Sequence, residues 1–385
     1  MPVAISGQDL HHRFKGNRCR LLYLVGQLRL GGLERQLYYL LAGMDLARYR
    51  PAVVVWNLDL TEKYFGDIKA LKIPITGYPS EWSPLYKLYE FRALARQVNP
   101  EVIHSYGFHT NFAAHYAAQA SGALAIGSVR SDFFWAKREG GIIKSALNAR
   151  WPYSYISNSR SAVEAMNGNG GFFMPRQVLV VRNGLDLNRF QCSNEDQMGK
   201  SYIAAVGTLS PIKRWDRLLR VAQKLKTAGV GFLDFRIAGD GPLRRSLEKM
   251  AQDLDLSSNV KFIGECHDIP KFLRGAKFLV HTAEAEGCPN AVMEAMACGI
   301  PVVAMEAGDI PYLVEEKKSG FVVRQGDERT FGERLLLLLH DNELRTLMGT
   351  YARTKAERDF GVAHLVSETL AAYRAIGWKD GPRRV

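Results

Sequence analysis

Residues 278–304 read FLVHTAEAEGCPNAVMEAMACGIPVVA and decide the class of fold. The apolar run at residues 278–281 predicts a buried strand, and Gly287 and Pro289 predict that a helix starts just after Glu286. That helix covers residues 291–297 and leads into a second apolar strand at residues 301–304. A strand, a helix and a further strand in this order are typical of a parallel sheet with helices on its faces.

The same alternation extends over the rest of the chain. Upstream, strands are predicted at residues 21–25, 52–56, 73–75, 102–104, 125–129, 155–156 and 178–181, and helices at residues 33–44, 86–97 and 113–120. After a polar break, strands are predicted at residues 202–206, 235–238 and 260–263, and helices at residues 215–227 and 243–254. We therefore predict an α/β fold of two Rossmann-like, doubly wound parallel-sheet domains that face each other across a cleft.

The length of 385 residues agrees with two domains of ordinary size. We assign residues 1–19 to a basic, flexible leader, 20–190 to an N-terminal domain, 191–200 to a linker and 201–359 to a C-terminal domain.

Composition excludes several classes of protein. Hydrophobic residues make up 47% and charged residues 23%, which is the balance of a soluble globular chain rather than a disordered or collagen-like one. The longest apolar runs, such as residues 335–339, fall far short of the ~20 residues that cross a bilayer. No secretory signal pattern is visible at the start. We therefore expect a cytoplasmic protein.

The cysteines do not suggest a metal knuckle or a disulfide framework. There are five, an odd number, and no C-x-x-C spacing occurs; they are Cys19, Cys192, Cys266, Cys288 and Cys298.

The charge is basic and uneven. The net charge is +12, and residues 1–200 hold 24 lysine and arginine residues against 15 aspartate and glutamate residues. A basic first half suggests an anionic partner, such as nucleic acid, a phosphorylated substrate or an anionic membrane surface, with simple solubility as the alternative.

Glu286 and Glu294 lie on either side of the predicted helix start. A helix N-terminus directs backbone N–H groups and the positive end of the helix dipole outward, which suits a diphosphate. The two carboxylates are separated along the helix and can contact different parts of one elongated ligand. A carboxylate accepts two hydrogen bonds from a vicinal diol, so it suits ribose and sugar hydroxyl groups. For either glutamate alone, a capping or surface acid is the alternative.

The run E-G-x-P-N-x-x-x-E-A-M-A-x-G-x-P-V-V at residues 286–303 resembles the E-x7-E motif of retaining glycosyltransferases of family 4, which have the two-domain GT-B fold. Further segments resemble the family in the same order over residues 21–373: Gly31-Gly32-Leu33-Glu34, Ser157-Asn158-Ser159, Asn183-Gly184-Leu185-Asp186, Val206-Gly207-Thr208-Leu209 with Lys213, Ala238-Gly239-Asp240-Gly241-Pro242 and Phe262-Ile263-Gly264. The stretch 360–376 resembles the last helices of the family, so residues 360–385 are expected to cross back to the N-terminal domain.

The resemblance implies roles for the acidic and basic residues. Glu294 would bind the ribose hydroxyls of the nucleotide, and Glu286 would hold hydroxyls of the transferred sugar near its anomeric carbon. Lys213 would neutralise the charge that builds on the leaving nucleoside diphosphate.

The donor-binding backbone follows from the same resemblance. The segment Gly287, Cys288, Pro289 and Asn290 would line the sugar and diphosphate, and the glycine-rich turns at Gly31, Gly32 and Gly239 would face the donor.

The implied activity is a retaining, metal-independent hexosyl transfer. The donor would be a nucleotide-diphosphate sugar, most simply a UDP-sugar. The acceptor would be a polysaccharide or a lipid-linked glycan, as in polysaccharide biosynthesis. No cofactor is expected. The literal D-x-D at residues 253–255 ends a predicted helix and is not expected to bind metal.

The chain departs from the family pattern at the phosphate site. The arginine of the family's G-R-L segment is Thr208, so one phosphate cation is missing, and Arg214 is a candidate to replace it. After the strand at residues 125–129, Arg130 stands where many members have a histidine. It could reach the donor phosphate or an acidic acceptor, or it could form an ion pair with Asp132.

Histidines near the preceding strand also differ from the family. The family's H-x-H reads His104-Ser105-Tyr106 here, and His109 lies nearby as a candidate to face the acceptor. A single histidine is more often structural.

Residues 133–153 mix basic and apolar side chains. Such a stretch can dock on an anionic membrane, which would place the chain peripherally at the inner face of the membrane; a helix packed on the sheet is the alternative. Nucleic acid is not an expected partner.

Two other functions stay open. One is a nucleotide-sugar epimerase of the same fold, which would release free product without an acceptor. The other is a non-catalytic, basic binding protein on a degenerate GT-B scaffold, which leaves both glutamates unexplained.

Overall fold

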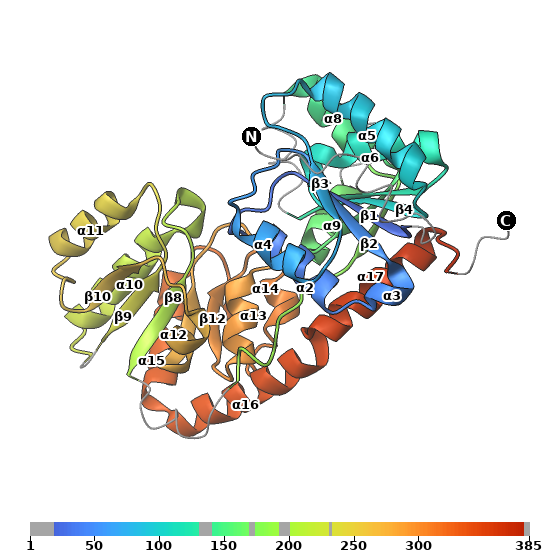
Figure 1. The fold of residues 1–385 in the computed structure, drawn as a ribbon. Coiled ribbons are helices and arrows are strands. Elements are labelled where there is room, and N and C mark those ends of the chain that lie inside the picture. The colour runs from blue at the N-terminus through green and yellow to red at the C-terminus, as the bar shows by residue number, and fades with distance from the viewer. Residues whose placement is uncertain (1–18, 131–140, 169–173, 192–200, 231–232, 381–385) are drawn as a thin grey trace. The chain divides into compact units, whose positions relative to one another are not determined.

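The computed structural model describes residues 19–130, 141–168, 174–191, 201–230 and 233–380 (Figure 1). The chain divides into two compact units, which are described separately below. Unit 1 comprises Met1–Gly184 and Val362–Val385, and unit 2 comprises Leu185–Gly361. Nearly all of the predicted leader and linker lies outside the described residues.

Unit 1 contains a seven-stranded parallel sheet in the order β3-β2-β1-β4-β5-β6-β7. The strands are β1 (Leu21–Val25), β2 (Pro51–Val55), β3 (Ile75–Gly77), β4 (Val102–Ser105), β5 (Leu124–Val129), β6 (Ser154–Ser157) and β7 (Gln177–Val180). Every residue of β1 and β2 is buried, as expected for strands that are covered on both faces.

Helices cover both faces of this sheet. One core joins the strands to α2 (Gly32–Ala42), α4 (Lys63–Ala70) and α17 (Val362–Ile376), and another joins them to α5 (Pro84–Val98) and α6 (Asn111–Ser121). The unit also contains α3 (Leu46–Tyr49), α8 (Ile142–Arg150), α9 (Arg160–Gly168) and the short helix η1 (Phe108–Thr110). In Figure 1 the red helix α17 lies beside α2, with which it packs.

Unit 2 contains a six-stranded parallel sheet in the order β10-β9-β8-β11-β12-β13. The strands are β8 (Tyr202–Val206), β9 (Phe235–Ala238), β10 (Val260–Gly264), β11 (Ala276–His281), β12 (Val302–Met305) and β13 (Gly320–Val323). Two such parallel sheets confirm the predicted fold class.

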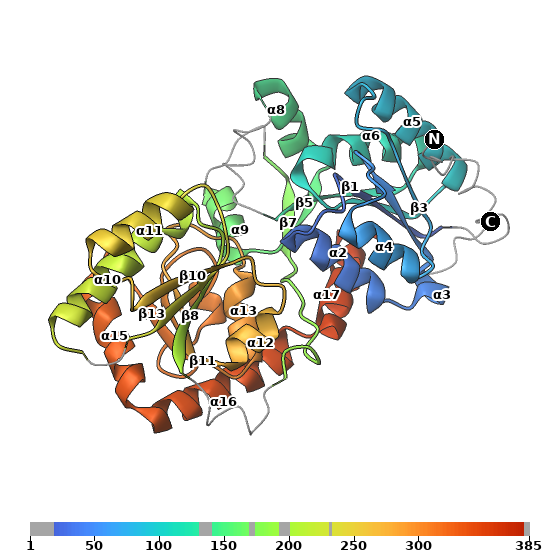
Figure 2. The same cartoon turned by 60° about the vertical axis from the view of Figure 1, so that its left-hand side comes forward.

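Two helical layers enclose the second sheet as well (Figure 2). One layer contains α10 (Trp215–Thr227), α11 (Arg244–Asp253) and α15 (Glu328–His340). The other contains α12 (Ile269–Arg274), α13 (Asn290–Ala297), α14 (Ile310–Leu313) and α16 (Asn342–Asp359). The short helix η3 (Pro211–Lys213) precedes α10.

The strand orders locate a switch point in each unit. In unit 1 the chain winds outward from β1 in one direction and from β4 in the other, and in unit 2 from β8 and β11. The loops after these two central strands diverge at the carboxyl edge of the sheet, which is where open α/β sheets bind ligands.

The described cysteines, Cys19, Cys266, Cys288 and Cys298, are free thiols. Among the helices that the structure describes, none combines the length and the apolar character needed to span a membrane.

Candidate functional site

The strongest candidate site of unit 2 lies at its switch point, between the loops that follow β8 and β11. Lys213 comes from η3 after β8, and Glu286 comes from the loop after β11. Their side chains meet: Nζ of Lys213 forms an ion pair and hydrogen bond with Oε1 of Glu286. The structure thus brings together two residues that are 73 positions apart in sequence and that were both predicted as catalytic.

A third residue, His281, contacts the same carboxylate. It is the last residue of β11, its side chain is only 2% exposed, and its Nε2 lies 3.1 Å from Oε1 of Glu286. Oε2 of Glu286 forms no hydrogen bond or ion pair with any residue that the structure describes. One carboxylate oxygen is therefore held from two sides, and the other stays available.

The surroundings of Glu286 keep it ionised. Burial alone would raise the pKa of its carboxyl group, but the contacts with His281 and Lys213, hydrogen bonds from both and the charge of the lysine, outweigh burial and lower that pKa to about 2. Because an ionised carboxylate only accepts hydrogen bonds, Nε2 of His281 is the donor in its contact with Oε1.

The loops after β8 and β11 are also joined to each other. The Thr282 hydroxyl donates to the carbonyl oxygen of Lys213 at 2.9 Å. The backbone N–H of Glu284 donates to the carbonyl oxygen of Ile212, also at 2.9 Å. These bonds fix the backbone from which Lys213 extends relative to the loop that carries Glu286.

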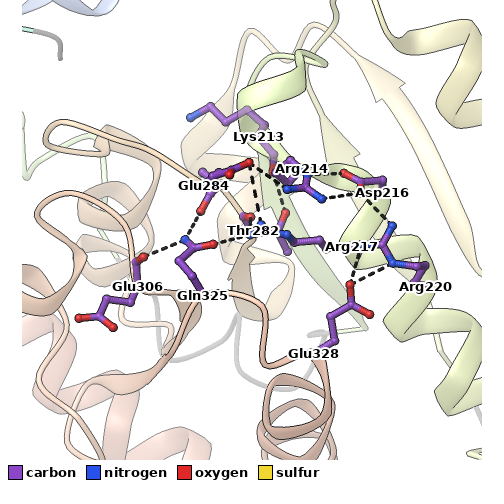
Figure 3. Close-up of polar contacts among 11 residues, drawn as sticks. Lys213, Arg214, Asp216, Arg217, Arg220, Thr282, Glu284, Glu306, Gln325 and Glu328 are labelled. Atoms are coloured by element: carbon purple, nitrogen blue, oxygen red, sulfur yellow. Dashed lines mark hydrogen bonds and ion pairs between the residues drawn. The ribbon is translucent and has the colours of Figure 1, made fainter. Parts of the chain in front are cut away.

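A network of arginines and carboxylates supports the same junction (Figure 3). The Arg214 guanidinium donates to both oxygens of Asp216, at 3.0 and 3.1 Å, and to Glu284 at 2.9 Å. Hydrogen bonds from these two carboxylates raise the Arg214 pKa above its ordinary value. Arg220 extends the network from Asp216 to Glu328. In Figure 3 the Lys213 side chain points away from this network.

Arg214 was predicted as a replacement for the missing phosphate cation at Thr208. The structure places its guanidinium on the carboxylates of Asp216 and Glu284, which joins the two loops, and its contact with a phosphate stays a prediction. Thr208 is exposed, and its hydroxyl lies 3.1 Å from that of Ser210.

Gly308 packs against the Glu286–Gly287 backbone. Its φ is +51°, and a Cβ atom at this position would lie 2.2 Å from the carbonyl oxygen of Glu286. The next residue, Asp309, donates its backbone N–H to the carbonyl oxygen of Gly287 at 2.9 Å. The loop that carries Glu286 is therefore held closely from the β12–α14 connection.

Helix α13 follows this loop and carries the second glutamate. Pro289 is its N-cap, Asn290 its first residue, and the N-terminus has no side-chain cap. Glu294 is 3% exposed and Cys288 is 7% exposed, with its Sγ 3.5 Å from Sδ of Met293. The predicted donor segment thus leads into a helix whose one glutamate, Glu294, is buried.

Two glycine-rich turns pack closely at the same edge of unit 2. Gly239 has φ +144°, and a Cβ atom there would lie 2.0 Å from the carbonyl oxygen of Gly207, which itself has φ +155°. Next to this contact, the backbone N–H of Leu209 donates to the carbonyl oxygen of Asp240 at 2.9 Å. Gly239 is therefore required for the approach of two backbones.

Unit 1 places the predicted glycine loop at its own switch point. Gly31 is the N-cap of α2 and Gly32 its first residue. A Cβ atom at Gly31 would lie 2.3 Å from Oε2 of Glu34, whose side chain folds back over the loop. Burial raises the pKa of Glu34.

The histidines of unit 1 have different surroundings. His109 lies in η1 after β4 and is exposed. His104 is buried; its Nδ1 lies 2.7 Å from the Tyr373 hydroxyl and its Nε2 lies 2.9 Å from the Ser128 hydroxyl. Burial and the charge of Arg130 lower the His104 pKa well below its ordinary value, so this residue is neutral and structural.

Arg130 follows β5 directly. Its guanidinium carbon lies 3.8 Å from the centre of the Tyr106 ring. Nε and Nη1 of Arg130 are buried without a hydrogen-bond partner among the described residues. The alternative ion pair with Asp132 falls outside those residues.

Sequence reasoning missed His281 and Gly308. The only signal for His281 is a polar residue at the carboxyl end of an apolar strand, five residues before Glu286. Nothing in the sequence around Gly308 distinguishes it from an ordinary turn glycine. Within the described part of the chain, no group of three or more histidine, cysteine, aspartate or glutamate side chains could hold a metal ion.

Two family models match the chain. Residues 30–189 match the model described as Glycosyltransferase Family 4, and residues 189–355 match the model described as Glycosyl transferases group 1.

Curated relatives are similar over part of their length. An uncharacterized glycosyltransferase of Haemophilus influenzae is 31% identical over 167 residues, which are 43% of this chain and 47% of that protein. The amylovoran biosynthesis glycosyltransferase AmsK of Erwinia amylovora is 31% identical over 204 residues, 51% of this chain and 50% of that protein. The chain thus spans about half the length of the curated relatives it matches.

Among solved structures, Anabaena HepE in complex with UDP has a TM-score of 0.76 at 20% identity, covering 92% of this chain and 100% of that chain. The same protein has been solved with UDP-glucose, at a TM-score of 0.76 and 20% identity, covering 92% of this chain and 99% of that chain. At this identity the likeness establishes the fold.

Proposed function

The chain belongs to glycosyltransferase family 4, since the models described as Glycosyltransferase Family 4 and Glycosyl transferases group 1 together match residues 30–355. We propose that it transfers a sugar from a nucleotide-diphosphate donor to a glycan acceptor with retention of configuration. The observation that carries the proposal is the contact of Lys213 with Glu286 at the switch point of unit 2, at the entrance to the helix that bears Glu294.

Each part of this site suits one part of the donor. Glu294 binds the ribose hydroxyls, and Oε2 of Glu286 accepts hydrogen bonds from the hydroxyls of the sugar. Lys213 neutralises charge on the departing diphosphate, an electrostatic contribution that increases as the bond to the anomeric carbon breaks. The bond from the anomeric carbon to the diphosphate oxygen is replaced by one to the acceptor oxygen, and the acceptor's proton passes to the diphosphate.

We assign the donor to the UDP-sugars and the acceptor to a polysaccharide or lipid-linked glycan. The similar Anabaena structures contain UDP and UDP-glucose, which supports the choice of UDP. The name of the Erwinia relative, which refers to amylovoran biosynthesis, supports a polysaccharide pathway. The transfer requires no metal, because Lys213 supplies positive charge at the diphosphate.

Turnover of a panel of UDP-, GDP- and ADP-sugars tests this function. The purified chain is incubated with each donor and with membrane glycolipid and polysaccharide fractions, and released nucleoside diphosphate and labelled glycan are measured. Glu286→Gln and Lys213→Met are each expected to lower turnover by about 100-fold or more. The control is Glu306→Gln, since this exposed glutamate contacts Gln325 only through its carbonyl oxygen.

The outcome also separates the competing functions. An α-linked product from an α-linked donor, identified from the anomeric proton coupling in the NMR spectrum, supports retention. Free epimerised sugar nucleotide without an acceptor would favour the epimerase. Salt-sensitive binding of nucleic acid without any nucleotide-sugar turnover would favour the non-catalytic scaffold.

We also propose that unit 1 docks on an anionic membrane surface. Helix α6 packs against both α5 and α8. Leu85 of α5 and Ile143 of α8 are each 78% exposed, and Tyr89 of α5 is 66% exposed. Lys144 is exposed next to Ile143, and exposed apolar and aromatic side chains with neighbouring cations suit the headgroup region of an anionic bilayer.

Vesicle sedimentation tests this docking. The chain is expected to pellet with phosphatidylglycerol vesicles and less with phosphatidylcholine vesicles, and the double variant Leu85→Ser/Tyr89→Ser is expected to lose the difference. Leu347→Ser is the matched control, because Leu347 is 69% exposed but lies on α16 of unit 2. Equal pelleting of the double variant and the wild type would contradict the proposal.

A further inference from the structure

His281 is the residue of the site that neither the sequence nor the proposed function explains. It is a buried histidine at the carboxyl end of β11, where the two preceding residues, Leu279 and Val280, are apolar. Its Nδ1 is buried without a hydrogen-bond partner among the described residues, so its one described polar contact is the bond from Nε2 to Glu286. Burial of a ring nitrogen without a partner costs free energy, so the bond from Nε2 to Glu286 is the one described polar contact that offsets burial of this ring.

Lys213 and His281 hold Glu286 in different ways. Lys213 reaches Oε1 through a long, flexible side chain from a three-residue helix, and that side chain is 19% exposed. His281 reaches the same oxygen from β11, which pairs with β8 on one side and β12 on the other. The lysine can therefore leave Oε1 without rearrangement of the backbone, whereas the histidine is held in place by the sheet.

The proposed reaction gives Lys213 a second anion to contact. The ammonium has three N–H donors, and those that turn to the diphosphate weaken its hold on Oε1 of Glu286. If the lysine were the only anchor, this weakening would loosen the Glu286 carboxylate at the moment when the sugar must be held. A second donor on the same oxygen removes that conflict.

We propose that His281 is a positioning residue that holds Oε1 of Glu286 from the sheet, so that Oε2 stays directed to the hydroxyls of the transferred sugar when Lys213 moves to the diphosphate. This inference rests on the proposed function and adds to it a separation of roles: His281 affects recognition of the sugar and not of the nucleotide.

The test compares the affinities for UDP-glucose and UDP in the full chain. Calorimetric titration gives the ratio of the two dissociation constants for the wild type and for His281→Leu. If the donor panel identifies UDP-galactose or UDP-N-acetylglucosamine as the donor, that sugar nucleotide replaces UDP-glucose. Loss of the anchor is expected to weaken the UDP-sugar by about tenfold or more relative to UDP, since hydrogen bonds to charged groups are typically worth factors of about 10 to 100.

Two amide variants separate positioning from packing. The terminal amide nitrogen of Gln takes the place of Nε2, so His281→Gln is expected to restore most of the wild-type ratio. The amide nitrogen of Asn takes the place of Nδ1 and falls short of Glu286, so His281→Asn is expected to behave like His281→Leu. If the leucine variant does not fold, the two amide variants still decide the question.

A double variant tests whether His281 acts through Glu286. In a Glu286→Ala background, His281→Leu is expected to leave the ratio unchanged, because no side-chain oxygen remains for His281 to position. His340→Leu is the control for a histidine-to-leucine change, since His340 is exposed at the last residue of α15.

Two results would overturn the inference in distinguishable ways. A wild type that binds UDP-sugar and a His281→Leu variant with the same ratio within twofold would refute the role of His281 and leave the proposed function intact. A folded wild type that binds neither UDP nor any UDP-sugar would refute the proposed function, and the inference with it.

Discussion

Replacing Gly308 by alanine should damage both the stability of unit 2 and the donor site. The backbone at Gly308 has φ +51°, a left-handed conformation that costs an alanine roughly 1–2 kcal/mol. The added Cβ atom would also lie 2.2 Å from the carbonyl oxygen of Glu286 and 2.7 Å from that of Gly287. Both obstacles are backbone atoms, so the loop that carries Glu286 must shift.

A second glycine separates the two costs. Gly326 also has a positive φ, +84°, but a Cβ atom there would meet nothing within 4 Å. Gly326→Ala should therefore show the conformational cost alone. Gly308→Ala should add the cost of forced displacement, which is typically about 1–3 kcal/mol for overpacking. Its total destabilisation is then about 2–5 kcal/mol.

Thermal unfolding followed by circular dichroism measures this difference. For a unit of this size each kcal/mol lowers the midpoint by about 2–4 °C, so Gly308→Ala should melt at least about 2 °C below Gly326→Ala. Titration with UDP-glucose should show weaker binding by Gly308→Ala and unchanged binding by Gly326→Ala. Equal midpoints for the two variants, with equal donor affinity, would refute the close packing of Gly308 on the Glu286 loop.

Three further outcomes follow from the described contacts. Glu294→Gln should weaken UDP itself by about 10- to 100-fold in calorimetry, because the carboxylate is assigned to the ribose; unchanged UDP affinity would contradict that assignment. The Gln36 side chain donates to the Gly184 carbonyl oxygen at 2.9 Å and accepts from the Gly184 N–H at 2.6 Å. Gln36→Ala should therefore lower the free energy of unfolding, measured in urea, by about 1–3 kcal/mol for each buried group left unpaired. A loss of under about half a kcal/mol would count against these bonds. The Glu286 pKa is held at about 2, below its ordinary value of 4.5. The free energy of unfolding that wild type gains over Glu286→Gln should therefore be complete above about pH 5 and disappear as the pH falls from 4.5 towards 2. A gain that persists at pH 2 would show that the carboxylate is not responsible.

Much of the fold could be predicted because buried parallel strands are continuous apolar runs. The predicted strands at residues 202–206 and 235–238 and the predicted helix at residues 215–227 coincide with β8, β9 and α10. The Tyr202–Val206 strand lies at the centre of its sheet, where burial on both faces leaves little choice of residue.

Elements with weak local signals were missed. The edge strand β13 has only the four residues GFVV, and α4 contains Gly66 within its eight residues, which weakens a helical pattern. Their structure depends on the sheet and helices against which they pack, which no short window of sequence contains.

The residues of the site could be predicted from the sequence, but the contacts between their side chains could not. The motif spacing identified Lys213 and Glu286 separately, and their meeting follows from the loops after β8 and β11 at one switch point. The contact with His281 depends on the side chain of the last strand residue turning towards the following loop. The engagement of Arg214 by Asp216 and Glu284 depends likewise on tertiary structure.

Donor binding by the wild-type chain in the presence of EDTA tests the central claim most directly. Calorimetric titration with UDP-, GDP- and ADP-sugars should show saturable binding of one molecule per chain for one class of base, lost when Lys213→Met and Glu294→Gln are combined. No binding of any of these donors by a chain with a cooperative unfolding transition would contradict the assignment of the switch point of unit 2 as a nucleotide-sugar site.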